Sequence, residues 1–123
     1  GGDFGKLLMY HQLVGWIDTN YLDTFKAKNT KYYKDGKAKS EYPFLKGDGF
    51  DIYKILHREA RDIAGTSDKY DVCMKQNGKT KVDMFALCTS AILELNTIPF
   101  FEAWRAGTAI AGNVGGERII DRT

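Results

Sequence analysis

The sequence has few of the residues that build metal sites, disulfide frameworks or membrane spans. It contains two histidines and two cysteines. No apolar run approaches the roughly 20 residues that a membrane-spanning helix needs. Cys73 and Cys88 are too few for a disulfide framework, and their spacing fits no zinc module. They form either one bridge, if the protein is secreted, or two buried thiols.

The sequence also lacks a motif that would complete an active site. A common zinc-protease motif places two histidines one helical turn apart with a glutamate between them, and no such pair occurs. His11 and His57 fall in different predicted helices, where they could converge, but no third ligand is evident. Cys88 lies on an apolar helix face, and nothing near Cys73 in the sequence would activate it as a thiolate. We therefore predict no catalytic residue, no metal ligand and no cofactor in this chain.

The N-terminus lacks the order of a signal peptide, in which a basic segment precedes an apolar one. It reads Gly1-Gly2-Asp3 and has no initiating methionine. We expect either that a tag was cleaved or that the piece comes from a longer protein.

What is present is the composition of a packed domain. The chain has 123 residues, of which 43% are hydrophobic and 28% charged, enough for one core and too few for two. Its net charge of +2 gives no reason to expect nucleic acid as a partner. We predict a single helical domain over residues 1–107, with the Gly-rich residues 108–123 as a tail or the start of a further segment.

Apolar residues recur at intervals of three and four in several stretches, which predicts amphipathic helices. The first helix covers residues 4–25, with Gly15 as a point of close contact or a kink. The second is capped by Asp48, has Asp51 in its first turn and runs to about residue 64 before the expected stop at Gly65, and the third follows a capping residue at Thr80. A short fourth helix begins at residues 97–99 and ends near Gly107. The fold class is therefore mainly α, a small bundle of three longer helices and one short helix.

Six lysines gather between residues 26 and 39, interleaved with Tyr32 and Tyr33. Asp35-Gly36 within this stretch is a tight-turn signal and indicates a short β-hairpin. Asn77-Gly78, in the polar loop expected over residues 66–79, could form a second hairpin. The lysine-rich stretch is either an edge that binds anions or glycans, or a solvated loop.

Two segments resemble the closing part of the enhancin-type, mucin-degrading zinc metallopeptidases. The first, at residues 6–16, reads Lys-Leu-Leu-Met-Tyr-His-Gln-Leu and then Gly-Trp after one residue; the second, at residues 96–104, reads Asn-Thr-Ile-Pro-Phe-Phe-Glu-Ala-Trp. The resemblance covers about residues 6–107. It implies packing roles for the residues that match the family motifs: Tyr10, Gln12, Pro99, Phe100, Phe101 and Trp104.

The resemblance implies a secreted or surface-attached protease that acts on mucin-type glycoproteins and uses zinc to activate water. The zinc motif is absent here, so the chain would be the C-terminal helical lobe, inactive alone, and its partners would be the upstream catalytic lobe and the glycoprotein substrate. Candidates for contact with substrate are His11, Trp16, Tyr32 and Tyr33, although packing is the better role for Trp16.

A second hypothesis is a free-standing helical binding module, without catalysis, whose lysine- and tyrosine-rich edge contacts an acidic or glycan partner. A spacer within a large surface protein is a third. A lobe of a protease should expose an apolar face where it packs on the catalytic part, whereas a binding module should have a closed polar surface with a basic patch.

Overall fold

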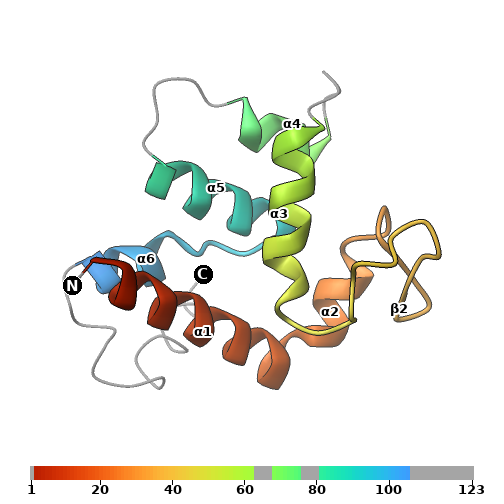
Figure 1. Cartoon of the computed structure of the whole chain (residues 1–123), viewed down its shortest axis with the longest axis horizontal. Coiled ribbons are helices and arrows are strands. Elements are labelled where there is room, and N and C mark those ends of the chain that lie inside the picture. Colours follow the sequence, from red (N-terminus) through yellow and green to blue (C-terminus); the bar gives the residue numbers. More distant parts are fainter. Residues whose placement is uncertain (1, 63–67, 76–80, 106–123) are drawn as a thin grey trace.

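A computed structural model describes residues 2–62, 68–75 and 81–105, with side chains described over residues 10–62, 68–75 and 84–102 (Figure 1). The elements, in chain order, are α1 (Gly2–Asn20), α2 (Leu22–Ala27), β1 (Tyr33–Lys34), β2 (Lys37–Ala38), α3 (Asp51–Arg61), α4 (Lys69–Met74), α5 (Lys81–Leu93) and α6 (Ile98–Arg105). The prediction of a mainly α fold with a small hairpin is confirmed. The Gly-rich tail lies outside the described residues.

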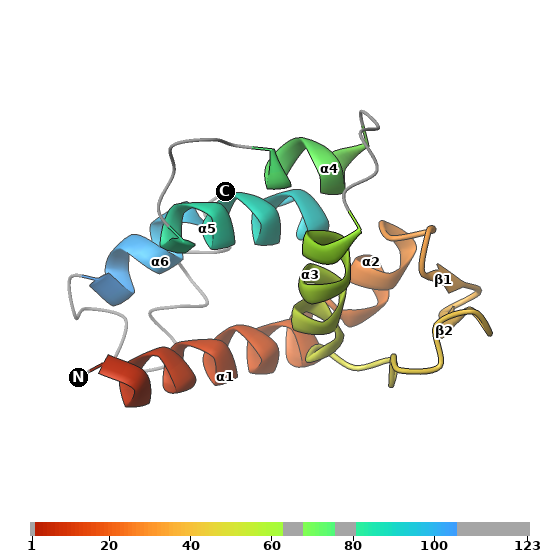
Figure 2. The same ribbon diagram turned by 45° about the horizontal axis from the view of Figure 1, so that its top comes forward.

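The helices stack in layers that two further helices close at one end. Figures 1 and 2 show α1 on one side, α5 with α6 next to it, and α4 against the far side of α5. α3 runs across the end of this stack, and α2 leads from there to the hairpin, far from the N-terminus. No described helix is both long and apolar enough to cross a membrane.

The first predicted helix is two helices, so its single span over residues 4–25 was wrong. α1 ends at Asn20, and Tyr21 leaves the helical conformation with φ −143°. The Tyr21 hydroxyl donates a hydrogen bond of 2.7 Å to the carbonyl of Leu93, 72 residues along the chain. Because this contact is distant in sequence, the regular spacing of apolar residues could not reveal the break.

The close contact expected at Gly15 occurs instead at Gly49. A side chain at Gly15 would meet no other atom within 4 Å, whereas a Cβ at Gly49 would lie 2.8 Å from the carbonyl oxygen of Val14. The Gly49 amide donates to the Asp18 carboxylate at 2.7 Å. Gly49 therefore lets the segment before α3 lie directly against α1. The second helix begins at Asp51, so Asp51 lies in its first turn as predicted, but its N-cap is Phe50 and not Asp48.

The hairpin at Asp35-Gly36 is confirmed. Tyr33 pairs with Ala38 and Lys34 with Lys37 in an antiparallel register. Asp35 and Gly36 have φ of 54° and 78°, the left-handed region that such a two-residue turn requires. The turn chemistry of the two central residues was sufficient to predict it.

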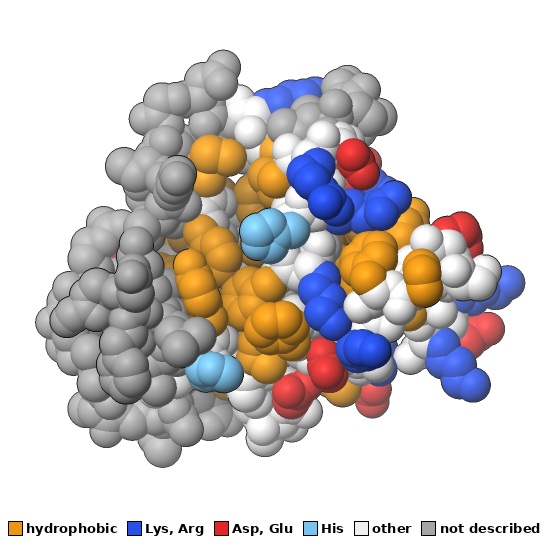
Figure 3. Space-filling view, viewed as in Figure 1, with side chains coloured by type: hydrophobic (Ala, Val, Ile, Leu, Met, Phe, Trp, Pro, Cys, Tyr) orange, Lys and Arg blue, Asp and Glu red, His pale blue; other side chains and the backbone are white. Residues whose placement is uncertain are grey.

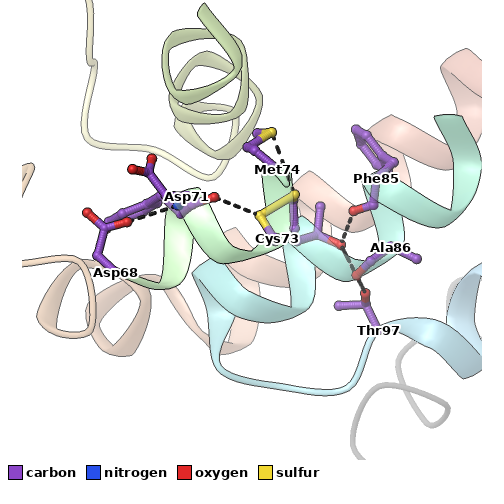
Figure 4. Close-up of a disulfide and its surroundings, with 10 residues drawn as sticks. Asp68, Asp71, Cys73, Met74, Phe85, Ala86 and Thr97 are labelled. Carbon is purple, nitrogen blue, oxygen red and sulfur yellow. Dashed lines mark hydrogen bonds between the residues drawn. A yellow bond between two sulfur atoms is a disulfide. The ribbon is translucent and has the colours of Figure 1, made fainter. Parts of the chain in front are cut away.

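The loop expected over residues 66–79 contains a helix, α4, which was not predicted. Asp68 caps it, because its carboxylate accepts a hydrogen bond of 2.9 Å from the Asp71 amide (Figure 4). With only six residues, α4 is too short to show a helical period. Asn77-Gly78, Gly65 and Thr80 lie outside the described residues.

Cys73 and Cys88 form a disulfide that joins α4 to α5, which decides between the two states left open by the sequence (Figure 4). Both residues are buried. The third predicted helix is confirmed as α5 and the fourth as α6. The disulfide thus fixes the six-residue α4 on a helix of the core.

A buried asparagine connects α2 to the last turn of α5. The Asn29 amide group donates to the carbonyls of Phe25 at 2.7 Å and Ile92 at 2.8 Å, and its oxygen accepts from the Tyr70 hydroxyl at 2.7 Å. Asn29 is fully buried, so losing any of these partners would leave a polar group unpaired in the core.

Candidate functional site

Aromatic side chains from four helical regions meet at one place, which we call the aromatic junction. The ring of Tyr10 on α1 lies 5.1 Å from both Tyr53 on α3 and Phe85 on α5. Phe85 lies 5.3 Å from Phe101 on α6, and Phe50, just before α3, lies 5.6 Å from Tyr53. These centroid separations are those of favourable aromatic pairs. The junction therefore connects α1, α3, α5 and α6.

One side of the aromatic junction faces solvent. Phe50 is 48% exposed, and Tyr10 and Phe85 are half-buried. Figure 3 shows apolar side chains gathered over the meeting point of α1, α3 and α5, with the chain's two histidines beside them. A contiguous apolar surface of this kind is typical of a contact with another protein segment.

The aromatic junction is held in place by a hydrogen bond between helices. The Tyr53 hydroxyl donates to the Tyr10 carbonyl at 2.9 Å. Burial raises the pKa of Tyr53 above its ordinary value, with a smaller contribution from Tyr10, so the hydroxyl remains protonated as a donor. The hydrogen bond thus fixes α1 against α3 at the aromatic junction.

The predicted contact residues occupy different environments. His11 and His57 are exposed beside the aromatic junction, on α1 and α3. Trp16 is buried and its ring stacks on Tyr21 at 5.4 Å, which is a packing position. Tyr32 and Tyr33 are buried, at 0% and 3% exposed.

The burial of these two tyrosines changes the character of the lysine-rich stretch. The Tyr33 hydroxyl donates to the buried carboxylate of Asp51 at 2.7 Å, and burial together with this bond raises its pKa. Tyr32 faces Tyr42 and Tyr70 in the core. The surface of the stretch is consequently made by its lysines.

The motif-matching residues lie on α1 and α6 or beside them. Phe100 and Phe101 are buried, and Gln12 and Pro99 are half-buried. The side chain of Trp104 lies outside the described residues. Tyr10 and Phe101 belong to the aromatic junction, where Phe85 lies between them. The two segments that carry the resemblance therefore converge on one surface.

The described part of the chain offers no zinc site. Among residues 10–62, 68–75 and 84–102, no group of three histidine, cysteine, aspartate or glutamate side chains could hold a metal ion. Both cysteines are committed to the disulfide, so their sulfurs are not available as thiolate ligands.

Sequence reasoning placed Phe50 and Tyr53 on the apolar face of one helix and Phe85 on that of another, and it missed that these residues form one surface. It also missed the role of Asp51, which it had placed only as a favourable charge in the first turn of a helix. The buried Asp51 carboxylate accepts hydrogen bonds from the Tyr33 hydroxyl and from the Lys46 and Gly47 amides. The apolar spacing signals burial of a face, but it does not say which faces meet.

The chain is similar to two curated bacterial proteins. It is 33% identical over 112 residues to "Putative lipoprotein YghJ" of Escherichia coli O78:H11 and, to the same extent, to "Putative lipoprotein AcfD homolog" of Escherichia coli K12. The match covers 87% of this chain but 7% of each relative, so the chain spans a small part of their length. No family model matches the chain, and no solved structure matches it significantly.

Proposed function

We propose that this chain is a supporting helical lobe of a much larger, envelope-associated zinc metallopeptidase of the enhancin type that acts on mucin-type glycoproteins. The observation that carries the proposal is the 33% identity to two putative lipoproteins, which extends over 87% of the chain. The enzymatic part of the proposal comes from the resemblance of residues 6–16 and 96–104 to that family. Their convergence on the aromatic junction supports treating them as one structural unit.

The disulfide supports the envelope location. Cysteine pairs persist in oxidising compartments and at cell surfaces and are rare in the cytosol. A lipoprotein is attached to a membrane by its lipid, so the described helices need no membrane-spanning segment for such a location. The Cys73–Cys88 bond thus agrees with the kind of protein that the relatives are named as.

The aromatic junction supports the role of a lobe that packs on another part of the protein. The side chain of Phe50 is 48% exposed. Covering it with a neighbouring segment would remove apolar surface from water, which is favourable in free energy. The zinc ligands would belong to that neighbouring part, because the described residues offer none. In this arrangement the lobe positions the catalytic part and performs no chemistry itself.

The test is a mucin-cleavage assay on the full-length protein that contains this chain, with and without a zinc chelator. Phe50→Ser removes an exposed ring of the aromatic junction, and Val72→Ser on α4, also 48% exposed, is the matched control. We expect chelator-sensitive cleavage, reduced about tenfold in kcat/KM by Phe50→Ser, which corresponds to about 1.4 kcal/mol. Val72→Ser should leave the rate unchanged within about twofold.

Two results would contradict the proposal. Absence of chelator-sensitive cleavage by the folded full-length protein would remove the enzyme and favour the binding module. Equal rates for wild type and Phe50→Ser, with cleavage present, would leave the enzyme intact and remove the role of the aromatic junction as a docking surface.

A further inference from the structure

A cavity of about 530 Å³ lies between α2 and the hairpin, at the opposite end of the domain from α6. This volume is in the range of pockets that hold small ligands. Charged and polar side chains surround it, namely Asp23, Lys26, Thr30, Lys34, Asp35 and Lys39. The cavity does not touch the aromatic junction, and an inference drawn from it is independent of the proposed function.

The lysines of this cavity differ from the other lysines of the same stretch. Lys28 pairs with Glu94 at 3.5 Å and Lys31 with Glu59 at 2.7 Å. Lys26, Lys34 and Lys39 form no ion pair with any residue in the described part of the chain, although two aspartates line the same cavity. Their ammonium groups are therefore available to an anionic ligand.

The walls of the cavity are fixed by buried contacts. Tyr33 lines the cavity, is 3% exposed and is bonded through its hydroxyl to Asp51 at 2.7 Å. Its ring packs edge-on against Phe25 at 5.6 Å. The Lys39 amide donates to the Tyr32 carbonyl at 2.9 Å, which holds the return strand in place. The backbone around the cavity is therefore fixed, and a ligand would have to order only the lysine side chains that bind it.

The mixture of charges selects the kind of ligand. Three lysines and two aspartates give the lining a formal charge of +3 − 2 = +1. A polyanion such as nucleic acid would be attracted by the lysines but repelled by both carboxylates. A ligand with one negative charge and several hydroxyl groups satisfies both, because carboxylates accept hydrogen bonds from hydroxyls and ammonium groups bind the anion.

We propose that this cavity binds an acidic sugar unit, with Lys34 and Lys39 on the acid group and Asp23 on the hydroxyls. Thr30 adds a hydroxyl that can donate or accept, and Ala27 supplies a small apolar surface for the C–H face of the ring. A single sugar unit bound at an open site of this size should have a Kd of about 1 mM, which corresponds to about −4 kcal/mol.

The test is a titration of the 123-residue chain, followed by amide chemical shifts in NMR, with methyl glucuronide as the probe. Methyl glucoside is the uncharged control, and sodium sulfate is the anion without a sugar. We expect shifts in residues 23–39 for the glucuronide, with affinity at least about tenfold above that for the glucoside and for sulfate.

Lys34→Glu combined with Lys39→Glu should weaken glucuronide binding at least about tenfold. Lys37→Glu is the matched control, because Lys37 pairs with Lys34 in the hairpin but does not line the cavity, and it should change the affinity less than about twofold. Asp23→Asn should weaken binding of the glucuronide and leave or strengthen that of sulfate. The amide spectra confirm that each variant is folded.

Several outcomes would overturn the proposal. If sulfate binds as tightly as the glucuronide, the cavity is an anion site that does not recognise the sugar. If the glucoside binds as tightly as the glucuronide, the lysines play no part in binding. An equal loss in Lys37→Glu means attraction by overall charge, and no shift at about 20 mM glucuronide means no site at all.

Discussion

The aromatic junction and the hairpin present two separate surfaces of the domain and use tyrosine in opposite ways. At the junction, Tyr10 is half-buried and forms part of a surface that neighbouring rings extend. At the hairpin, Tyr32 and Tyr33 are buried and support a surface made of charged residues. Figure 3 shows apolar side chains over α1, α3 and α5, and basic, acidic and apolar side chains mixed on the side of α2 and the hairpin.

The comparison teaches that burial of an aromatic residue decides which side chains a partner meets. Where the ring is partly exposed, the surface is apolar and suited to a permanent contact with another segment. Where the ring is fully buried, it fixes the backbone, and the charged side chains next to it form the surface. Four changes test this difference, from the largest expected effect to the smallest.

Phe101→Ala should destabilise the domain most, by about 3–4 kcal/mol, because it removes a ring that is 3% exposed and leaves a cavity. Phe50→Ala, at the exposed rim of the same aromatic junction, should cost less than about 1 kcal/mol. Urea unfolding followed by circular dichroism measures both. Similar losses for the two variants would mean that the junction is uniformly buried and has no free face.

Removal of the disulfide by Cys73→Ala combined with Cys88→Ala should cost about 3 kcal/mol, the value expected for a bridge that closes 15 residues. A reducing agent should lower the urea midpoint of the wild-type protein and leave that of the double variant unchanged. A midpoint unaffected by reduction would show that α4 is held by its other contacts.

Lys31→Ala should destabilise the domain by about 1–2 kcal/mol, because Glu59, whose side chain is 2% exposed, would lose its cation. The expected loss is kept this small because the Lys31 side chain is 40% exposed, so that water screens its attraction to Glu59. Lys34→Ala, on the same stretch but without an ion pair among described residues, should change stability by less than about 0.5 kcal/mol.

Adding Glu59→Gln to Lys31→Ala should restore part of the loss, since the uncompensated charge is removed. If Lys31→Ala and Lys34→Ala lower the stability to thermal unfolding equally, then the ion pair of Lys31 with Glu59 does not distinguish Lys31 from Lys34.

The smallest effect concerns pH. A hydrogen bond from Lys69 lowers the pKa of Glu94 below its ordinary value of 4.5, with further contributions from the charges of Lys69 and Lys28 and an opposing one from desolvation. The resulting stability is present above pH 4.5 and is lost as the pH falls through the lowered pKa of the folded state.

Glu94→Gln should therefore lower the free energy of unfolding by about 0.3 kcal/mol at pH 6, because the site is exposed, and should not lower it at pH 2. Thermal unfolding at the two pH values measures the difference. Glu41→Gln, an exposed glutamate without an ion pair in the described part of the chain, is the control and should show no such dependence. A loss that is equal at both pH values would mean that Glu94 acts through packing and not through its charge.

The sequence by itself determined the features that depend on neighbours in the chain. Asp35-Gly36 predicted the hairpin because only a few residue types accept two successive positive φ angles. The apolar spacing predicted α3, α5 and α6, and the absence of a histidine pair at helical spacing left no zinc-protease motif to place. Such signals are local, so no knowledge of the fold was needed to use them.

Only the tertiary structure decided which distant residues meet. It paired Cys73 with Cys88, placed the hydroxyl of Tyr21, where the first predicted helix breaks, on the carbonyl of Leu93, and buried Tyr32 and Tyr33. It also brought the rings of Tyr10 and Phe101, which are 91 residues apart in the sequence, into contact with the ring of Phe85. The physical reason is that apolar surface is buried without regard to direction, so the spacing of residues along a helix marks a face for burial and leaves its partner to the packing of the whole chain.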